Sequence, residues 1–275
     1  METNFTVRYG DAQRNSDGIR TSSWTFEMHP KIATLVKRVF NQLGYEIIRL
    51  PKDTNSSSYA LVTPQATYSP WNKDNAFQAT YKTIQPYTLV DKYRCYELWC
   101  LIEQSSKLGS GNIIEIGVWR GGTGVLIAQR AKSIGIPDKV YLCDTFTGVV
   151  KTGAMDPVYK GGEHGDTSRK LVEGLISRVK LDNVEILEGI FPEQTSQEIE
   201  HLRFRFCHID VDVYQSAKDI VGWIWQKMVR GGIIVYDDYG FVGCDGIAKY
   251  IEEQTPLKDR LIINNLNGHA VIIKL

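Results

Sequence analysis

Hydrophobic positions in this chain follow two alternating patterns. Short, nearly continuous apolar runs are typical of strands buried on both faces of a parallel sheet, and stripes with a period of about 3.6 residues predict helices. The runs cover residues 113–118, 139–143, 184–187, 206–209 and 233–236. The stripes between and after them cover residues 125–131, 171–179, 217–228 and 246–253. This alternation predicts a doubly wound α/β domain with a mostly parallel, Rossmann-like sheet.

The C-terminal pattern predicts a β-hairpin. Apolar residues 261–264 and 270–274 flank Asn267-Gly268, a two-residue turn signal. We therefore expect one antiparallel strand at an edge of the sheet. The helix predicted for residues 217–228 should end at Gly231-Gly232.

The first 85 residues have a different character. Residues 1–30 are polar and without period, residues 32–43 form an amphipathic helical stripe, and residues 45–50 could form a short strand. Residues 52–86 are rich in Ser, Thr, Asn, Gln and Pro and predict a long loop, whereas residues 91–107 predict a partly buried helix. We expect an N-terminal extension over residues 1–85, making lid, ligand or oligomer contacts, and an α/β domain over residues 86–275.

The bulk composition narrows the class of protein. The 275 residues carry 32 Lys+Arg and 32 Asp+Glu, which argues against nucleic-acid and anionic-membrane partners. The five cysteines are dispersed without a C-x-x-C pair, as in a reduced cytoplasmic protein. No signal-like N-terminus occurs, and no apolar run approaches the roughly 20 residues of a membrane span. We expect a cytoplasmic homodimer or higher homo-oligomer, since the stripe at residues 32–43 must be covered by its own domain or by a second subunit.

A glycine-rich turn follows the first predicted strand. Gly117, Gly121 and Gly122 do not match the dinucleotide pattern G-x-G-x-x-G, so a NAD-linked dehydrogenase is disfavoured. An acidic residue followed by G-x-x-x-G-G suits a carboxylate-bearing cofactor such as S-adenosylmethionine (SAM), with Glu115 accepting a hydrogen bond from its ammonium. A tight turn without any ligand explains this stretch equally well.

Acidic residues follow five successive predicted strands: Glu115, Asp144, Glu188, Asp210 with Asp212, and Asp237 with Asp238. Ligands of open α/β sheets bind outside the carboxyl ends of the strands, and like charges gathered there need a cation or many donors between them. Asp144 is placed to bind ribose hydroxyls, and Glu188 and Gly189 could line an adenine. Asp210, Asp237 and Asp238 are hard oxygen ligands that suit Mg²⁺.

Two residues are candidates for the general base. Asp210 and Asp212 lie two apart and share one face of an extended strand, so one can bind metal while Asp212 reaches a substrate proton. A simple turn accounts for this pair nearly as well. His164 is the second candidate, on a glycine-rich, lid-like segment over residues 146–167, although an exposed loop histidine needs no function.

Four motifs together resemble the macrocin O-methyltransferase family: residues 115–123 (EIGVWRGGT), 144–148 (DTFTG), 209–214 (IDVDVY) and 231–239 (GGIIVYDDY). The resemblance covers residues 86–275 and implies SAM- and Mg²⁺-dependent methylation of sugar hydroxyls on natural products. It implies metal ligands at Asp210, Asp237 and Asp238, a base at Asp212, and a segment at residues 86–90 that folds over the cofactor. The residues expected to contact the cofactor are Glu115, Gly117, Gly121, Thr123, Asp144, Thr145, Glu188, Gly189 and Asp210.

Other functions fit part of this pattern. A metal-dependent glycosyltransferase could use Asp210 and Asp212 to hold a nucleotide sugar, but it leaves Glu115 and the glycine turn without a role. A non-catalytic SAM-binding scaffold is the second alternative. Residues 1–85 do not match the family pattern, so the acceptor, a small glycoside or polyol, is not identified by the sequence.

Overall fold

The computed structural model describes residues 4–7, 24–27, 30–42, 59, 62 and 66–275. The chain divides into two compact units, Met1–Thr63 and Pro64–Leu275. In the first unit, β1 (Asn4–Val7) pairs antiparallel with β2 (Trp24–Glu27), and α1 spans Pro30–Gln42, close to the predicted helix. The predicted strand at residues 45–50 lies outside the described residues.

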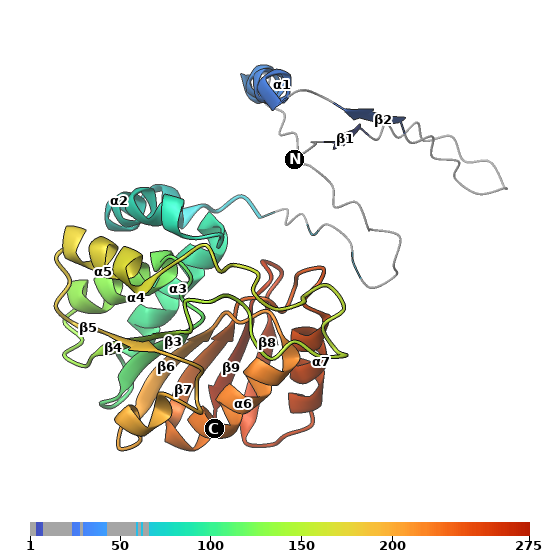
Figure 1. Cartoon of the computed structure of the whole chain (residues 1–275). Coiled ribbons are helices and arrows are strands. Elements are labelled where there is room, and N and C mark those ends of the chain that lie inside the picture. The colour runs from blue at the N-terminus through green and yellow to red at the C-terminus, as the bar shows by residue number, and fades with distance from the viewer. Residues whose placement is uncertain (1–3, 8–23, 28–29, 43–58, 60–61, 63–65) are drawn as a thin grey trace. The chain divides into compact units, whose positions relative to one another are not determined.

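The second unit contains a seven-stranded mixed sheet with the order β5-β4-β3-β6-β7-β9-β8 (Figure 1). Strands β3 to β7 are parallel, and β9 runs antiparallel to both of its neighbours. The α/β prediction is therefore confirmed. The strands are β3 (Asn112–Ile116), β4 (Val140–Asp144), β5 (Val184–Glu188), β6 (Phe204–Ile209), β7 (Met228–Tyr236), β8 (Arg260–Asn264) and β9 (Ala270–Lys274).

Helices cover both faces of this sheet and define two cores. One core joins the sheet to α2 (Asn75–Ile84), α3 (Lys92–Ser105), α4 (Gly122–Ser133) and α5 (Arg169–Arg178). The other joins it to α6 (Tyr214–Ile224) and α7 (Asp245–Gln254). Adjacent strand residues serve opposite cores, as Ile113 and Ile114 do, because side chains alternate across a strand. None of the helices in the described part of the chain is long and apolar enough to cross a bilayer.

The strand order places a ligand crevice between β3 and β6. The chain runs from β3 to β4 and β5 on one side, then returns to β6 and β7 on the other. The helices that follow β3 and β6 consequently lie on opposite faces, which opens a crevice at the carboxyl ends of these two strands.

Four details differ from the sequence prediction. The expected loop at residues 52–86 contains α2, whose Phe77 and Ile84 are fully buried in the first core. The compact unit accordingly begins before the expected boundary at residue 85, since α2 packs with α3 and α4. The antiparallel strand β9 lies inside the sheet rather than at its edge, and Gly231-Gly232 belong to β7 instead of ending a helix.

Candidate functional site

A cavity of about 310 Å³ opens at the carboxyl ends of the parallel strands. The segments that follow β3, β4, β5, β6 and β7 all contribute to its wall, together with residues 87–90 before α3. It is therefore the crevice that the strand order predicts. Of the residues selected from the sequence, it is lined by Gly117, Thr123, Asp144, Thr145, His164, Gly189, Asp210, Asp212, Asp237 and Asp238.

Gly117 brings the ends of β3 and β6 into contact. Its φ is +87°, and a Cβ added there would lie 1.7 Å from the carbonyl oxygen of Asp210. Only glycine accommodates both the left-handed backbone and the close approach. The turn then runs through Trp119, also at a positive φ of 48°, into α4. The glycine spacing thus serves packing at the cavity wall.

Asp144 organises this turn from the end of β4. Its Oδ2 accepts hydrogen bonds from the backbone N–H groups of Val118 (2.6 Å) and Trp119 (2.8 Å). Its Oδ1 accepts one from Phe146 N–H at 2.6 Å. Oδ1 accepts only one hydrogen bond and has a second lone pair, so Asp144 can hold the turn and still accept from a ligand hydroxyl.

Three carboxylates converge beyond β6 and β7. Oxygen atoms of Asp210, Asp237 and Asp238 all lie within 4.8 Å of one another. Burial raises the pKa of the Asp210 carboxyl well above its ordinary value, and the neighbouring charges of Asp237 and Asp238 raise it further. Such a group of hard oxygen donors matches the preference of Mg²⁺.

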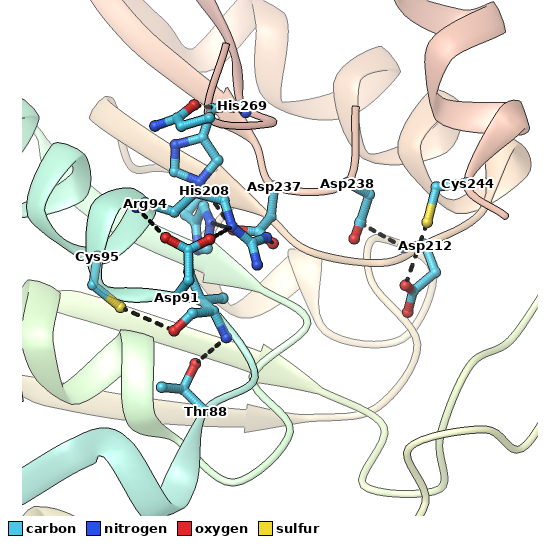
Figure 2. A network of polar contacts seen from close by, with 12 residues as sticks. Thr88, Asp91, Arg94, Cys95, His208, Asp212, Asp237, Asp238, Cys244 and His269 are labelled. Atoms are coloured by element: carbon cyan, nitrogen blue, oxygen red, sulfur yellow. Dashed lines mark hydrogen bonds and ion pairs between the residues drawn. The ribbon is translucent and has the colours of Figure 1, made fainter. Parts of the chain in front are cut away.

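Asp237 is held by three basic side chains, as Figure 2 shows. His269 Nε2 lies 2.9 Å from its Oδ1, His208 Nε2 lies 3.6 Å from the same oxygen, and the Arg94 guanidinium donates to Oδ2. Burial would raise the pKa of Asp237, but the contacts with His208 and His269 and the charge of Arg94 outweigh it and lower the pKa. Asp237 is therefore ionised within a buried cluster.

Asp238 fixes the backbone of the candidate base. Its Oδ2 accepts from the N–H groups of Val211 (3.2 Å) and Asp212 (2.9 Å). Asp212 has a left-handed φ of 63°, which is uncommon for a residue with a side chain. Its Oδ1 accepts a hydrogen bond from the Tyr159 hydroxyl and lies 3.8 Å from the Cys244 thiol (Figure 2 shows the thiol contact).

Three of the expected cofactor contacts do not line the cavity. Glu115 is fully buried, and its Oε1 lies 2.8 Å from Nδ1 of His208 on the neighbouring strand. Gly121 packs against Val172 of α5, and Glu188 is an exposed residue 3.8 Å from Arg169. The other oxygen of Glu115, Oε2, lies against α4, where a Cβ added at Gly124 would be 2.5 Å from it, so the carboxylate is buried between the sheet and this helix.

The sequence analysis did not select Arg94, Tyr159 or His269 as residues of the site. Arg94 comes from α3, and its guanidinium also lies 4.3 Å from the centre of the Phe241 ring. Nothing in a single sequence marks these residues, because their acidic partners are far away along the chain. His164 does line the cavity and contacts the rings of Trp119 and Tyr159.

The strand order and the cavity at the switch point are those of class I methyltransferases. The family model described as Macrocin-O-methyltransferase (TylF) matches residues 38–271. The chain belongs to this family, as its four sequence motifs suggested.

Two curated relatives are similar to parts of the chain. The 8-demethyl-8-(2,3-dimethoxy-alpha-L-rhamnosyl)-tetracenomycin-C 4'-O-methyltransferase of Streptomyces olivaceus is 26% identical over 51% of this chain and 58% of its own length. The chain thus spans less than two thirds of that relative. Mycinamicin III 3''-O-methyltransferase of Micromonospora griseorubida is 25% identical over 64% of this chain and 74% of its own length.

Solved structures agree on the fold. The O-methyltransferase NovP matches with a TM-score of 0.60 and 21% identity, over 68% of this chain and 82% of that one. The calicheamicin methyltransferase CalS11 matches with a TM-score of 0.56 and 16% identity, over 76% of this chain and 94% of that one. At these identities the structures establish the fold and nothing finer.

Proposed function

We propose that this protein is a SAM- and Mg²⁺-dependent O-methyltransferase that acts on a hydroxyl of a small natural product, a sugar or another vicinal diol. The observation that carries this proposal is the cluster of Asp210, Asp237 and Asp238, whose oxygens lie within 4.8 Å of one another beside Asp212 in one cavity. Family membership and the relatives' names support O-methylation of glycosides.

The residues present fit a divalent cation. Burial first, and then the negative charges of Asp237 and Asp238, raise the pKa of Asp210, and the charge of Arg94 opposes this only in part. Asp210, Asp237 and Asp238 would hold the ion, which when bound supplies a Lewis acid that lowers the pKa of an acceptor hydroxyl.

The chain's own groups divide the remaining work. Gly117 and the backbone turn held by Asp144 would receive the SAM donor, with Thr123, Thr145 and Gly189 along the same wall. Asp212 would accept the proton of the acceptor hydroxyl, and His164 is the alternative base. Fixing the acceptor oxygen and the donor in one cavity supplies the orientation that a single displacement needs.

The test uses Asp210→Asn and Asp237→Asn, with Asp182→Asn as a matched control on the exposed surface. Transfer of labelled methyl from SAM to a panel of glycosides should fall roughly 100-fold or more in the first two variants and stay unchanged in the control. Calorimetric affinity for S-adenosylhomocysteine should be retained in all three. Chelator should abolish turnover and Mg²⁺ restore it, so near-normal turnover in either site variant or in chelator would refute the metal assignment.

A further inference from the structure

The segment that joins β4 to α5 crosses the site and carries Tyr159. This half-buried residue lines the cavity, and its hydroxyl donates a hydrogen bond to Asp212 Oδ1. The Cys244 thiol meets the same oxygen at 3.8 Å. Among the described residues no hydrogen bond reaches Oδ2, so this second oxygen of a cavity-lining residue keeps its lone pairs available.

The same segment is fastened to the body of the domain by Asp156, a carboxylate only 2% exposed. Its Oδ1 accepts from the backbone N–H of Tyr214 at 2.9 Å, and its Oδ2 accepts from Gly153 N–H at 3.0 Å. Tyr214 is the first residue of α6, where a carboxylate satisfies an orphan N–H and interacts favourably with the helix dipole.

The first turn of α7 also makes room for Asp156. A Cβ added at Gly246 would lie 2.1 Å from Asp156 Oδ1. The carboxylate therefore sits against the beginnings of two helices, and only a glycine on α7 admits it. A surface loop held only by solvent-exposed contacts would not need such a buried, charged anchor.

Asp156 and Tyr159 are close to each other along the chain, and both contact the segment that carries the candidate base. Asp156 and Tyr159 are three residues apart, and Tyr214, which Asp156 holds, follows Asp212 by two residues. Asp238 fixes the backbone of Asp212, and Tyr159 fixes its carboxylate. Together these contacts define which carboxylate oxygen is presented to a substrate.

We propose that Tyr159 is a positioning residue for methyl transfer, orienting Asp212 so that Oδ2 receives the acceptor hydroxyl, and that Asp156 is the latch that holds Tyr159 in place. This inference rests on the proposed function. It assigns the segment between β4 and α5 a specific task in catalysis beyond covering the cavity.

Steady-state kinetics test the positioning role. Tyr159→Phe should lower kcat about 10- to 100-fold, the range for residues that orient a catalytic group, while KM for SAM and the affinity for S-adenosylhomocysteine change less than twofold. Tyr68→Phe is the control, because it also removes a phenol hydroxyl, from a side chain that is 81% exposed and does not line the cavity. Unchanged kcat in Tyr159→Phe would overturn the proposal.

A double-mutant cycle tests the latch. If Asp156 acts through Tyr159, then Asp156→Ala combined with Tyr159→Phe should reduce kcat no further than Tyr159→Phe alone. Asp156→Asn keeps an oxygen for Tyr214 N–H but loses the acceptor for Gly153 N–H, so it should fall between wild type and Asp156→Ala. Multiplicative losses in the double variant would show that the two residues act independently and would overturn the latch.

Limited proteolysis gives a readout that does not depend on turnover. Lys160 is an exposed tryptic site in this segment, and release of the latch should raise the rate of cleavage after Lys160 several-fold in Asp156→Ala. If the wild-type protein transfers methyl groups normally but Asp156→Ala is cleaved at the wild-type rate, the latch role of Asp156 is overturned and the positioning role of Tyr159 is not affected. A wild-type chain that transfers no methyl group would overturn the proposed function, and with it the role of Tyr159, whatever the proteolysis shows.

Discussion

At the scale of single residues, Gly117 shows how tightly the site is built. A side chain there would need a left-handed backbone and would meet the Asp210 carbonyl at 1.7 Å, so the ends of β3 and β6 would have to separate. The carboxylate cluster begins at Asp210. Displacement at this point therefore affects both stability and the cavity.

Gly117→Ala is expected to destabilise the protein by roughly 2–4 kcal/mol, more than backbone strain alone costs. Gly135→Ala is the matched control, because Gly135 has a similar φ of +75° but nothing within 4 Å of an added Cβ. Urea unfolding of both variants measures the difference. Equal losses would mean that the contact with Asp210 contributes nothing.

The carboxylate cluster leads to a second prediction, which concerns how the stability of the protein depends on pH. The pKa of Asp210 is raised in the folded protein, well above the ordinary value of 3.8 that applies to the unfolded chain. At a pH between the unfolded-state pKa and the folded-state pKa, the native state therefore binds more protons than the unfolded state. The contribution of Asp210 to stability therefore falls as pH rises through this window. Asp238 acts in the same direction, since burial and the charge of Asp212 raise its pKa.

At neutral pH without divalent cations, Asp210→Asn should accordingly be more stable than wild type, by about 2–4 °C in Tm for each kcal/mol of relieved repulsion. Added Mg²⁺ should raise the Tm of wild type and leave the variant unchanged. Thermal scans from pH 4 to pH 8 provide the measurement. A less stable variant at neutral pH would mean that Asp210 stabilises the metal-free fold.

At the scale of elements, α2 decides where the catalytic unit begins. Phe77 is fully buried, and its ring lies 4.9 Å from that of Tyr96 and 5.9 Å from that of Trp99 on α3. Asp74 caps α2 and also accepts a hydrogen bond from the Trp99 indole at 3.0 Å. These contacts make α2 part of the sheet's helical cover rather than part of a loop.

Phe77→Ala should therefore destabilise the protein by about 3–5 kcal/mol, as expected for a large buried aromatic side chain. Lys82→Ala on the exposed side of the same helix should change stability by less than about 0.5 kcal/mol. Denaturant midpoints distinguish these outcomes. A cost near 1 kcal/mol for Phe77→Ala would indicate that α2 is a loosely attached element.

At the scale of the whole molecule, we propose that the first unit takes part in assembly of subunits. Helix α1 exposes Ile32, Leu35 and Val39 within its own unit, and these residues form the predicted apolar stripe. A chain that starts at Pro64 should fold, because the second unit contains both hydrophobic cores. If α1 mediates assembly, light scattering will give this shorter chain a lower subunit number than the full chain. Equal subunit numbers would assign the stripe to another task.

The elements of the catalytic domain could be predicted because their signals are local. An apolar run such as residues 206–209 specifies a strand buried on both faces, and the acidic residues that follow successive parallel strands must then reach one edge of the sheet. Helix α2 was not predicted because most of its residues are polar. Only Phe77 and Ile84 are buried, and two apolar positions do not make a recognisable helical stripe.

The sequence by itself determined the α/β order, the family and the aspartates that line the cavity, because periodicity and motifs depend only on neighbouring residues. The tertiary structure decided which partner each charge has. Glu115 faces His208 across 93 residues, Arg94 reaches Asp237 across 143, and Tyr159 meets Asp212 across 53. Such pairs follow from strand order and helix placement, which a local pattern of polar and apolar residues does not encode.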